Sequence, residues 1–305
     1  MKAARIHRFG GSDRVAIEEV GTPRLKPKHA LVRVVAAGIN PVDWMTRERI
    51  YNPKGADRVP MTLGQDFAGV VERVAPGSAT RLREGDEVFG EAWGAFAEQV
   101  SVPVRDLVRK PDGLDFVTAA ALPMPGLTAW QVIETARPSK RKKILIHGAG
   151  GAVGSLAAQL AKWKGAYVIA TASRPSFRFL ERIGVDRIID YRRDRFEDEV
   201  EGVDVVIEHF GGDVQKRSFR VMKPGGMLIN LIGEIDRAAA RKARVEGVDF
   251  GMTYDTRDLA KIASLVARGI LDPHVSKVLS FDHVRRGLDM NQQGKSHGKV
   301  VLRVV

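Results

Sequence analysis

Apolar and polar residues follow two different patterns along this chain. Up to about residue 120, short apolar segments are separated by Gly and Pro; they are Ala30–Ala36, Ala68–Val74, Glu87–Phe89 and Ala95–Val102. Short strands with this punctuation are typical of a β-rich, barrel-like domain. From about residue 121, strand-like segments alternate with helical segments of roughly 10 to 12 residues. This alternation predicts βαβ units and a parallel sheet.

The second region allows individual elements to be assigned. We expect strands at Lys143–His147, Tyr167–Thr171, Arg187–Asp190, Val203–Ile207 and Met227–Leu231, and helical residues at Ala152–Trp163, Phe177–Ile183 and Ser218–Met222. Because the strands are nearly continuous apolar runs, both faces of the sheet should be covered by helices. After Asp255 we expect a helix at Leu259–Ala267, a strand at Val275–Leu279, a helix from Phe281 and a last strand at Lys299–Val304.

Composition places the chain among ordinary globular proteins. Its 305 residues correspond to about two domains. Hydrophobic residues make up 44% and charged residues 28%, which excludes a disordered or low-complexity protein. No apolar run reaches the roughly 20 residues that cross a bilayer, and Met1 to Gly11 has no apolar core of a signal peptide. We therefore expect a cytoplasmic protein without a membrane span.

Cysteine content and net charge exclude further classes. The chain has no cysteine, so disulfides, thiolate catalysis and cysteine-ligated zinc are excluded. Its net charge of +12 raises the question of a nucleic-acid partner. However, the basic residues are scattered except at Arg137–Lys143 and at Arg192, Arg193 and Arg195, and no aromatic stripe accompanies them. We do not expect nucleic-acid binding to be the main function.

A glycine cluster lies between the first strand and the first helix of the βαβ region. Glycine allows the backbone to approach a pyrophosphate closely, and the helix start offers free N–H groups and a positive dipole. In this context the cluster predicts dinucleotide binding by Gly148, Gly150, Gly151, Ala152, Val153 and Gly154.

The residues after the second strand of this region bear on cofactor choice. Sites that prefer NAD place an acidic residue there, which accepts hydrogen bonds from the ribose hydroxyls. Here Ser173 and Arg174 occupy that place, Arg178 follows one helical turn later, and no carboxylate precedes Glu181. Arginine pairs with a 2′-phosphate. The sequence favours NADPH over NADH.

With these features, the chain resembles the zinc-independent medium-chain dehydrogenases/reductases, in particular the quinone oxidoreductase (zeta-crystallin-like) branch. The motifs that carry the resemblance are Ala36–Asp43, Leu63–Val71, Gly85–Gly90, Gly126–Trp130, Gly148–Gly154 and Gly298–Val301. The resemblance implies an α/β protein with two domains. One is a GroES-like β-barrel catalytic domain formed by residues 1–120 and 255–305. The other is a Rossmann NADP-binding domain, residues 121–254, built on a doubly wound parallel sheet. It also implies a homodimer joined through edge strands, for which Val245–Met252 is the candidate segment.

The resemblance also bears on metal binding. Zinc-dependent relatives carry a cysteine before the Asp of the first motif and Gly-His-Glu in the second motif. This chain has Asn40 and Gln65 at the corresponding ligand positions, and it lacks the four cysteines of the structural zinc lobe. We expect no metal.

Without a Lewis acid, the charge that develops during reduction of an isolated ketone has little to stabilise it. Conjugated carbonyls and quinones delocalise that charge, and together with the resemblance this argument predicts such a small-molecule substrate. The catalytic candidates implied by the resemblance are Asn40, Arg47, Tyr51 and Gln65. The Tyr51 hydroxyl would donate to the substrate, although the residue could instead be a packing residue of its loop. The loop departs from the family at Arg49, where Gly is usual, and at Lys54–Arg58, which lacks the common apolar lining. The identity of the substrate therefore stays open.

The remaining carried-over residues concern the cofactor and structural carboxylates. Thr128 should lie near the nicotinamide, Tyr191 near the adenosine phosphate, and Phe210, Gly211, Leu231 and Ile232 along the nicotinamide ribose. Asp43 and Asp66 are expected to accept backbone or arginine hydrogen bonds rather than to act as bases.

Two other functions stay open at this point. An enoyl-thioester reductase would use the same Tyr position, and basic residues near the site would suit a phosphorylated carrier. A protein of another class, an NADPH-binding sensor or an RNA-binding protein with a vestigial reductase site, is disfavoured because Asn40, Tyr51 and Thr128 accompany the glycines and stacking aromatics are absent.

Overall fold

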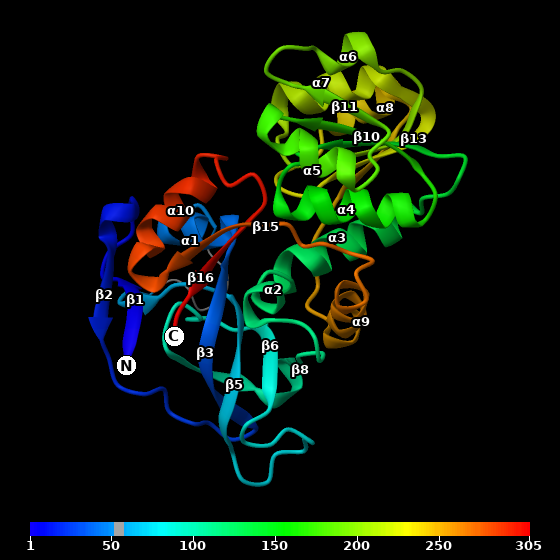
Figure 1. Cartoon of the computed structure of the whole chain (residues 1–305). Helices are drawn as coiled ribbons and strands as arrows, with labels where there is room; N and C mark the ends of the chain where they lie inside the picture. The colour runs from blue at the N-terminus through cyan, green and yellow to red at the C-terminus, as the bar shows by residue number, and fades with distance from the viewer. Residues whose placement is uncertain (52–57) are drawn as a thin grey trace. The chain divides into compact units, whose positions relative to one another are not determined.

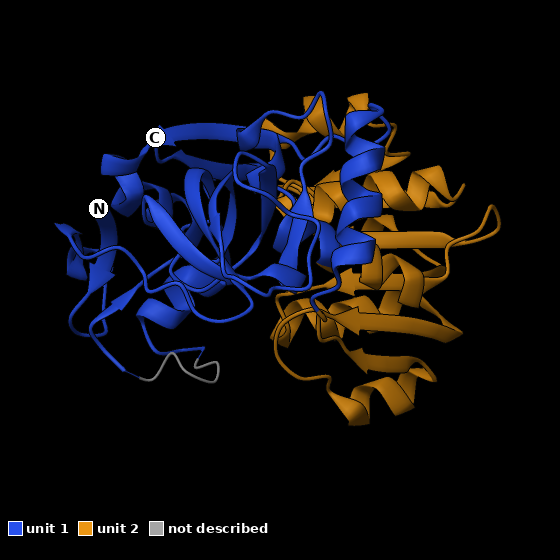
Figure 2. Ribbon diagram, turned by 90° about the horizontal axis from the view of Figure 1, so that it is seen from below, with its two compact units in different colours: residues 1–127, 254–305 blue, residues 128–253 orange. Residues whose placement is uncertain are grey.

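The computed structural model describes residues 1–51 and 58–305 (Figure 1). The chain divides into two compact units, coloured separately in Figure 2. Unit 1 consists of Met1–Leu127 and Tyr254–Val305, and unit 2 is the intervening segment Thr128–Thr253. The tail therefore returns to the unit that contains the N-terminus.

Unit 2 is built on one parallel sheet. Its strands are β9 (Lys143–His147), β10 (Tyr167–Ala172), β11 (Arg187–Asp190), β12 (Val203–Glu208), β13 (Met222–Asn230) and β14 (Glu246–Asp249). Their spatial order is β11-β10-β9-β12-β13-β14, with every neighbouring pair parallel. This is the strand order of the Rossmann fold, whose direction reverses between β9 and β12.

Helices cover both faces of this sheet, as its apolar strands require. They are α4 (Ala152–Trp163), α5 (Phe177–Arg182), α6 (Phe196–Glu199), α7 (Gly212–Val221) and α8 (Arg237–Ala243). In Figure 1, α4 and α5 lie on one side of the sheet and α6, α7 and α8 on the other. On the latter side, Phe196, Phe219 and Ala240 pack into one buried cluster with strand residues such as Leu145 and Val206.

The core of unit 1 forms around β3 (His29–Ile39). The order of the main sheet is β15-β16-β3-β5-β6-β8, and β7 also pairs with β3. The other strands of this sheet are β5 (Asp66–Val74), β6 (Glu87–Glu91), β7 (Gln99–Pro103), β8 (Leu107–Arg109), β15 (Val275–Ser280) and β16 (Lys299–Arg303). A smaller sheet joins β2 (Val15–Glu19), β1 (Lys2–Ile6) and β4 (Met61–Thr62). Because β16 pairs antiparallel with β3, the C-terminal tail completes the barrel-like fold of this unit.

Helices and helical turns connect these strands. In unit 1 they are α1 (Pro41–Arg47), α2 (Phe116–Ala120), α9 (Thr256–Ala267) and α10 (Val284–Gln292), and α3 (Pro123–Ala136) contains the boundary between the units. The 3₁₀ turns are η1 (Ser12–Arg14), η2 (Val104–Asp106), η3 (Arg174–Ser176) and η4 (Phe281–His283). Asn40 is the N-cap of helix α1, and its N–H donates to the Asp43 carboxylate 2.7 Å away; Pro41 occupies the first helical position.

Two predicted strands differ from the structure. The predicted strand Ala95–Val102 is wrong in its first half, because the N–H groups of Ala95 and Phe96 donate to the Gly64 and Leu63 carbonyls outside any strand, and β7 starts only at Gln99. The predicted strand Met227–Leu231 is wrong at both ends. Strand β13 already begins at Met222, continues past an irregularity at Gly225, where φ is +79°, and ends at Asn230.

Candidate cofactor and substrate site

The carboxyl edge of the unit 2 sheet carries nearly all the predicted cofactor residues. Because the strands are parallel and adjacent, the residues that follow them share one edge of the sheet. These residues are Gly148 after β9, Ser173 and Arg174 after β10, Tyr191 after β11, Phe210 and Gly211 after β12, and Leu231 and Ile232 after β13. Thr128 lies on α3 instead.

The geometry of the turn after β9 accounts for its glycines. Gly148 has φ +65°, a conformation that favours glycine. A Cβ at Gly154 would lie 2.6 Å from the Gly148 carbonyl oxygen, and one at Gly150 would lie 2.2 Å from the Ser176 Oγ. Helix α4 starts after Gly151, so the N–H groups of its first turn, including those of Ala152 and Val153, have no intrahelical acceptor. The turn therefore presents unpaired N–H donors on a backbone that only small residues allow.

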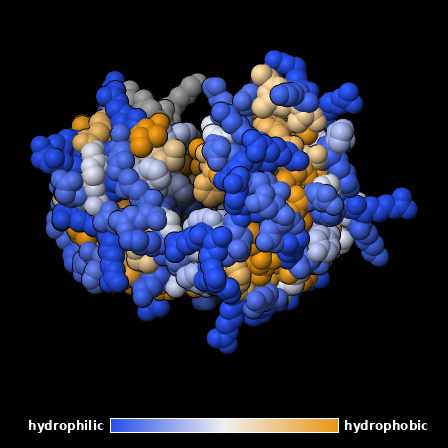
Figure 3. Space-filling model, turned by 90° about the horizontal axis from the view of Figure 1, so that it is seen from above, coloured by the Kyte–Doolittle hydropathy of each residue, from blue (hydrophilic) through white to orange (hydrophobic). Residues whose placement is uncertain are grey.

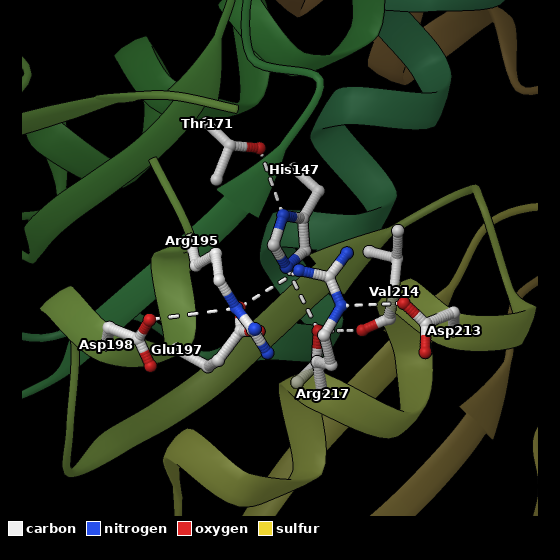
Figure 4. Close-up of polar contacts among 9 residues, drawn as sticks. His147, Thr171, Arg195, Glu197, Asp198, Asp213, Val214 and Arg217 are labelled. Atoms are coloured by element: carbon white, nitrogen blue, oxygen red, sulfur yellow. Dashed lines mark hydrogen bonds and ion pairs between the residues drawn. The ribbon is translucent and has the colours of Figure 1, made fainter. Parts of the chain in front are cut away.

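A buried histidine under this turn holds it in place (Figure 4). The His147 Nδ1 lies 3.0 Å from the Thr171 Oγ1, and its Nε2 lies 3.0 Å from the Ser218 Oγ. Because the Ser218 hydroxyl donates to the Val214 carbonyl, Nε2 carries the proton and Nδ1 accepts from Thr171. Burial lowers the pKa of His147 to about 3, so the ring is neutral. His147 thus connects β9, β10 and α7 at the level of the glycine turn.

Charged residues surround the far side of this histidine (Figure 4). The Phe196 and His147 rings meet edge to face, with centroids 4.6 Å apart, and the Arg217 guanidinium lies over the Phe196 ring. Arg217 donates to Glu197, which also accepts from Arg195. The network joins α6 to α7 and was not indicated by the sequence pattern.

Carboxylate and amide groups shape the next turns along the edge. Glu208, fully buried at the end of β12, accepts hydrogen bonds from the N–H groups of Phe210 and Gly211 at 2.7 and 2.8 Å. At the end of β13, the Asn230 Oδ1 accepts from the Ile232 N–H at 3.1 Å. Phe210 and Ile232 are nevertheless exposed, although both are large and apolar. Exposed apolar side chains at this edge are available to pack against the flat rings and riboses of a dinucleotide.

Basic side chains lie beyond β10 and β11. The Arg174 side chain is 67% exposed, contacts the Asp190 carboxylate only at 3.5 Å and lies over the Phe177 ring. Arg178 and Tyr191 are also exposed or partly exposed. Because Arg174 is only loosely engaged, its guanidinium remains available to an anion. The donors of the glycine turn, the exposed apolar groups and these arginines fit a dinucleotide of the NAD(P)H type.

The catalytic candidates Asn40 and Gln65 lie in unit 1, at a cluster of buried polar residues. Asn40 is 3% exposed, and its Nδ2 donates to the Asp66 Oδ2 at 2.7 Å. Asp66 also accepts from the Met124 N–H and from the Lys299 ammonium. The backbone hydrogen bond agrees with the expectation of backbone or arginine donors, while the charged donor is a lysine rather than an arginine. Gln65 is 8% exposed, and its buried Nε2 has no hydrogen-bond partner within the described chain.

Two further carboxyl groups lie near this cluster. Burial, reinforced by the charge of Asp66, raises the pKa of Asp43 to about 7. Burial and the same neighbouring charge raise the pKa of Glu91 to about 8. Asp43 accepts the Asn40 N–H, as expected for a structural carboxylate. Neither Glu91 nor Lys299 was singled out from the sequence, since each lies in a strand where an isolated charge usually faces solvent.

Arg47 and Tyr51 have different surroundings. The Arg47 side chain is fully buried and donates to the Gly10 carbonyl, to Glu48 and to Gln292. These contacts tie α1 to the N-terminal loop and to α10. Tyr51 lies just after α1 and is 44% exposed. The Lys54–Arg58 stretch falls outside the described residues except for Arg58.

Among residues 1–51 and 58–305, no three His, Cys, Asp or Glu side chains are grouped to hold a metal ion. None of the helices in the same residues is long and apolar enough to span a membrane. The face drawn in Figure 3 is mostly hydrophilic, with small hydrophobic patches.

Two family models match the sequence. The model described as "Alcohol dehydrogenase GroES-like domain" covers residues 26–112, and the one described as "Zinc-binding dehydrogenase" covers residues 183–302. Among solved structures, the quinone oxidoreductase from Coxiella burnetii is 29% identical, with a TM-score of 0.94 over 100% of this chain and 99% of that chain.

Two of the curated relatives extend over nearly the whole chain. The 2-methylene-furan-3-one reductase of Solanum lycopersicum is 33% identical over 100% of this chain and 79% of its own length. The chloroplastic NADPH-dependent alkenal/one oxidoreductase of Arabidopsis thaliana is 31% identical over 99% of this chain and 79% of its own length. The human quinone oxidoreductase is 29% identical over 75% of this chain and 72% of its own length. Given these matches and the two folds described above, this chain belongs to the medium-chain dehydrogenase/reductase superfamily, in its quinone oxidoreductase branch.

Proposed function

We propose that this chain is an NADPH-dependent, metal-free reductase that transfers a hydride to quinones or α,β-unsaturated carbonyls. The observation that carries the proposal is the carboxyl edge of the unit 2 sheet, where a tightly packed glycine turn lies beside the loosely engaged Arg174. The relatives support the same chemistry, since they include an alkenal/one oxidoreductase and a quinone oxidoreductase.

The cofactor-binding residues divide into three groups by what they offer. The glycine turn with Ala152 and Val153 offers N–H donors to the pyrophosphate. Ser173, Arg174, Arg178 and Tyr191 would surround the 2′-phosphate and adenosine. Thr128, Phe210, Gly211, Leu231 and Ile232 would contact the nicotinamide ribose and ring. When bound, NADPH would supply the hydride.

The chain's own contribution to the reaction is to bind the acceptor and stabilise charge. A conjugated acceptor spreads the developing negative charge onto a carbonyl oxygen, so a few hydrogen-bond donors suffice. We assign Asn40 and the Tyr51 hydroxyl as those donors, with Gln65 beside them. Arg47 would support this region through its contacts with Gly10 and Gln292.

Three further assignments accompany this function. Residues 1–120 and 255–305 form the catalytic domain and residues 121–254 the NADP-binding domain. The chain acts as a homodimer. It acts in the cytoplasm, although its relatives include proteins named as chloroplastic and mitochondrial.

The test is steady-state oxidation of NADPH by the purified chain with four acceptors: a quinone, an enone, an enoyl thioester and an isolated ketone. We expect turnover with the quinone or the enone and little with the ketone, and chelators should not change it. Turnover with the thioester alone would identify an enoyl-thioester reductase. Tight NADPH binding without turnover on any acceptor would instead indicate a cofactor-binding sensor.

A further inference from the structure

Lys299 is a buried cation that the proposed function does not use. It is the first residue of β16 and is 1% exposed. Its ammonium donates to the Asn40 Oδ1 and, at 3.0 Å, to the Asp66 Oδ2. Asp66 is itself fully buried. Lys299 therefore faces both the side chain assigned to the substrate and the carboxylate next to it.

These contacts determine how the Asn40 amide is oriented. Its Oδ1 accepts from the Lys299 ammonium, while its Nδ2 donates to the Asp66 carboxylate. A flipped amide would place its NH₂ against the ammonium and its oxygen against the carboxylate, which is strongly unfavourable in a buried site. Only one orientation of the amide is therefore compatible with the charged pair.

The backbone around this group is built to admit the lysine. A Cβ at Gly38, on the neighbouring strand β3, would lie 2.8 Å from the Lys299 Cε and 2.3 Å from the Ala120 carbonyl oxygen. The main chain of Asn40 is held separately, because its N–H donates to Asp43. With the main chain and both ends of the amide held, one N–H of Nδ2 remains for another acceptor.

We propose that Lys299 and Asp66 are positioning residues, which hold the Asn40 amide so that its remaining Nδ2 N–H faces the reacting carbonyl. The ammonium on Oδ1 also draws electron density from the amide nitrogen, which strengthens Nδ2 as a donor. The inference rests on the proposed function, since it needs Asn40 at the substrate. It adds residues that act through Asn40 and that lie far from it in the sequence.

An ion pair that only stabilises the fold would give the same crowded geometry. The test must therefore separate a stabilising role of Lys299 and Asp66 from a positioning role. Lys299→Met leaves Asp66 buried without its cation, and we expect it to lower both stability and turnover. The double variant Asp66→Asn/Lys299→Met removes both charges and should recover stability. However, the amide that this variant introduces at position 66 can face either way, so the orientation of Asn40 is no longer specified.

We expect the double variant to retain NADPH affinity within about twofold, measured by fluorescence titration, while kcat on an enone falls about tenfold. In an Asn40→Ala background, the same double substitution should lower kcat no further, because both act through one amide. Lys110→Met is the matched control: the Lys110 side chain is also largely buried and paired with a carboxylate, that of Glu87, and its loss should affect stability alone.

Two results would overturn the proposal. If the folded double variant turns over like the wild type, Lys299 and Asp66 are a structural pair only. If its effect multiplies with that of Asn40→Ala, the pair does not act through the amide. If the wild type oxidises NADPH with none of the acceptors, the proposed function fails together with the positioning role. An active wild type whose double variant is equally active overturns the positioning role alone.

Discussion

Asp66 on β5 and Glu91 on β6 occupy directly paired positions of two antiparallel strands. Paired residues of such strands project to the same face, so the two carboxyl groups are cross-strand neighbours. Ionising both would place like charges together in a buried environment. The pKa of Glu91 is accordingly raised to about 8, first by burial and then by the charge of Asp66. Near neutral pH Glu91 therefore keeps its proton, next to the ion pair of Asp66 with Lys299.

We predict that stability falls as pH rises from 6.5 to 8.5. A carboxyl whose folded pKa is raised binds its proton more tightly in the folded state, so stability is lost as pH rises towards that pKa. This holds for Asp43, with a pKa of about 7, and for Glu91, with a pKa of about 8. The lowered pKa of His147 acts oppositely, but only below its ordinary value near 6.5.

Urea unfolding should show a free energy of unfolding lower by about 2 to 3 kcal/mol at pH 8.5 than at pH 6.5. Glu91→Gln should remove most of this dependence. The matched control is Glu87→Gln on the same strand, whose half-exposed carboxyl pairs with Lys110. A Glu91→Gln variant with the slope of the wild type would show that Glu91 is ionised throughout this range.

NADPH should bind at least about tenfold more tightly than NADH, which corresponds to about 1.4 kcal/mol. One charge-assisted contact between the exposed Arg174 and the 2′-phosphate is enough to supply this difference. Arg174→Asp should reverse the preference, measured by fluorescence titration of both cofactors. Arg220→Asp on α7 makes the same charge change and should leave the ratio intact. Equal affinities in the unmutated protein would refute the assignment.

Gly154→Ala should destabilise unit 2, because its Cβ would lie 2.6 Å from the Gly148 carbonyl oxygen and 2.7 Å from the Ala149 Cα. Both contacts are to backbone, which cannot move away as a flexible side chain would. We expect a cost of about 1 to 3 kcal/mol in urea unfolding. Gly151→Ala, whose Cβ would come no closer than 3.4 Å to the Gly148 oxygen, should cost within about 0.5 kcal/mol. Similar costs for the two variants would contradict this reading of the turn.

Tyr51→Phe should lower turnover on an enone by up to about 10²-fold and change NADPH affinity little. A hydroxyl that bonds the carbonyl oxygen more strongly as charge develops stabilises the transition state selectively. The effect on a quinone should be smaller, because aromatisation already favours its reduced product. Tyr254→Phe removes a hydroxyl that donates to the Asp106 carbonyl, and should cost stability instead. Unchanged turnover in Tyr51→Phe on every acceptor would make Tyr51 a packing residue.

Light scattering should show a homodimer at micromolar concentration. Within the described chain, β14 pairs with β13 alone, so its other edge has unpaired N–H and C=O groups that a second copy could satisfy. Val248→Lys places a charge on that edge and should shift the protein to a monomer. A monomeric wild type would exclude this dimer.

Local pattern alone was sufficient for most of unit 2. Lys143–His147, Ala152–Trp163 and Arg187–Asp190 were predicted with the boundaries that the structure has. Strands buried on both faces must be continuous apolar runs, and the helix after the glycines has a clear start, so their boundaries are encoded in neighbouring residues. Helix α3 gave only a weak signal, because Leu127, Ala129, Val132 and Ile133 are all buried and Glu134 is its one exposed residue.

The buried polar cluster of unit 1 was decided by tertiary structure. Asn40 lies 259 residues from Lys299 in the sequence, and Asp66 lies 233 residues from it. They meet because β16 pairs with β3, and β3 with β5. Residue type and spacing indicated the glycine turn, and the resemblance to the family implied an amide at the site. Whether a charge is buried, and what it pairs with, depends on which strands become neighbours, and local sequence does not specify that neighbourhood.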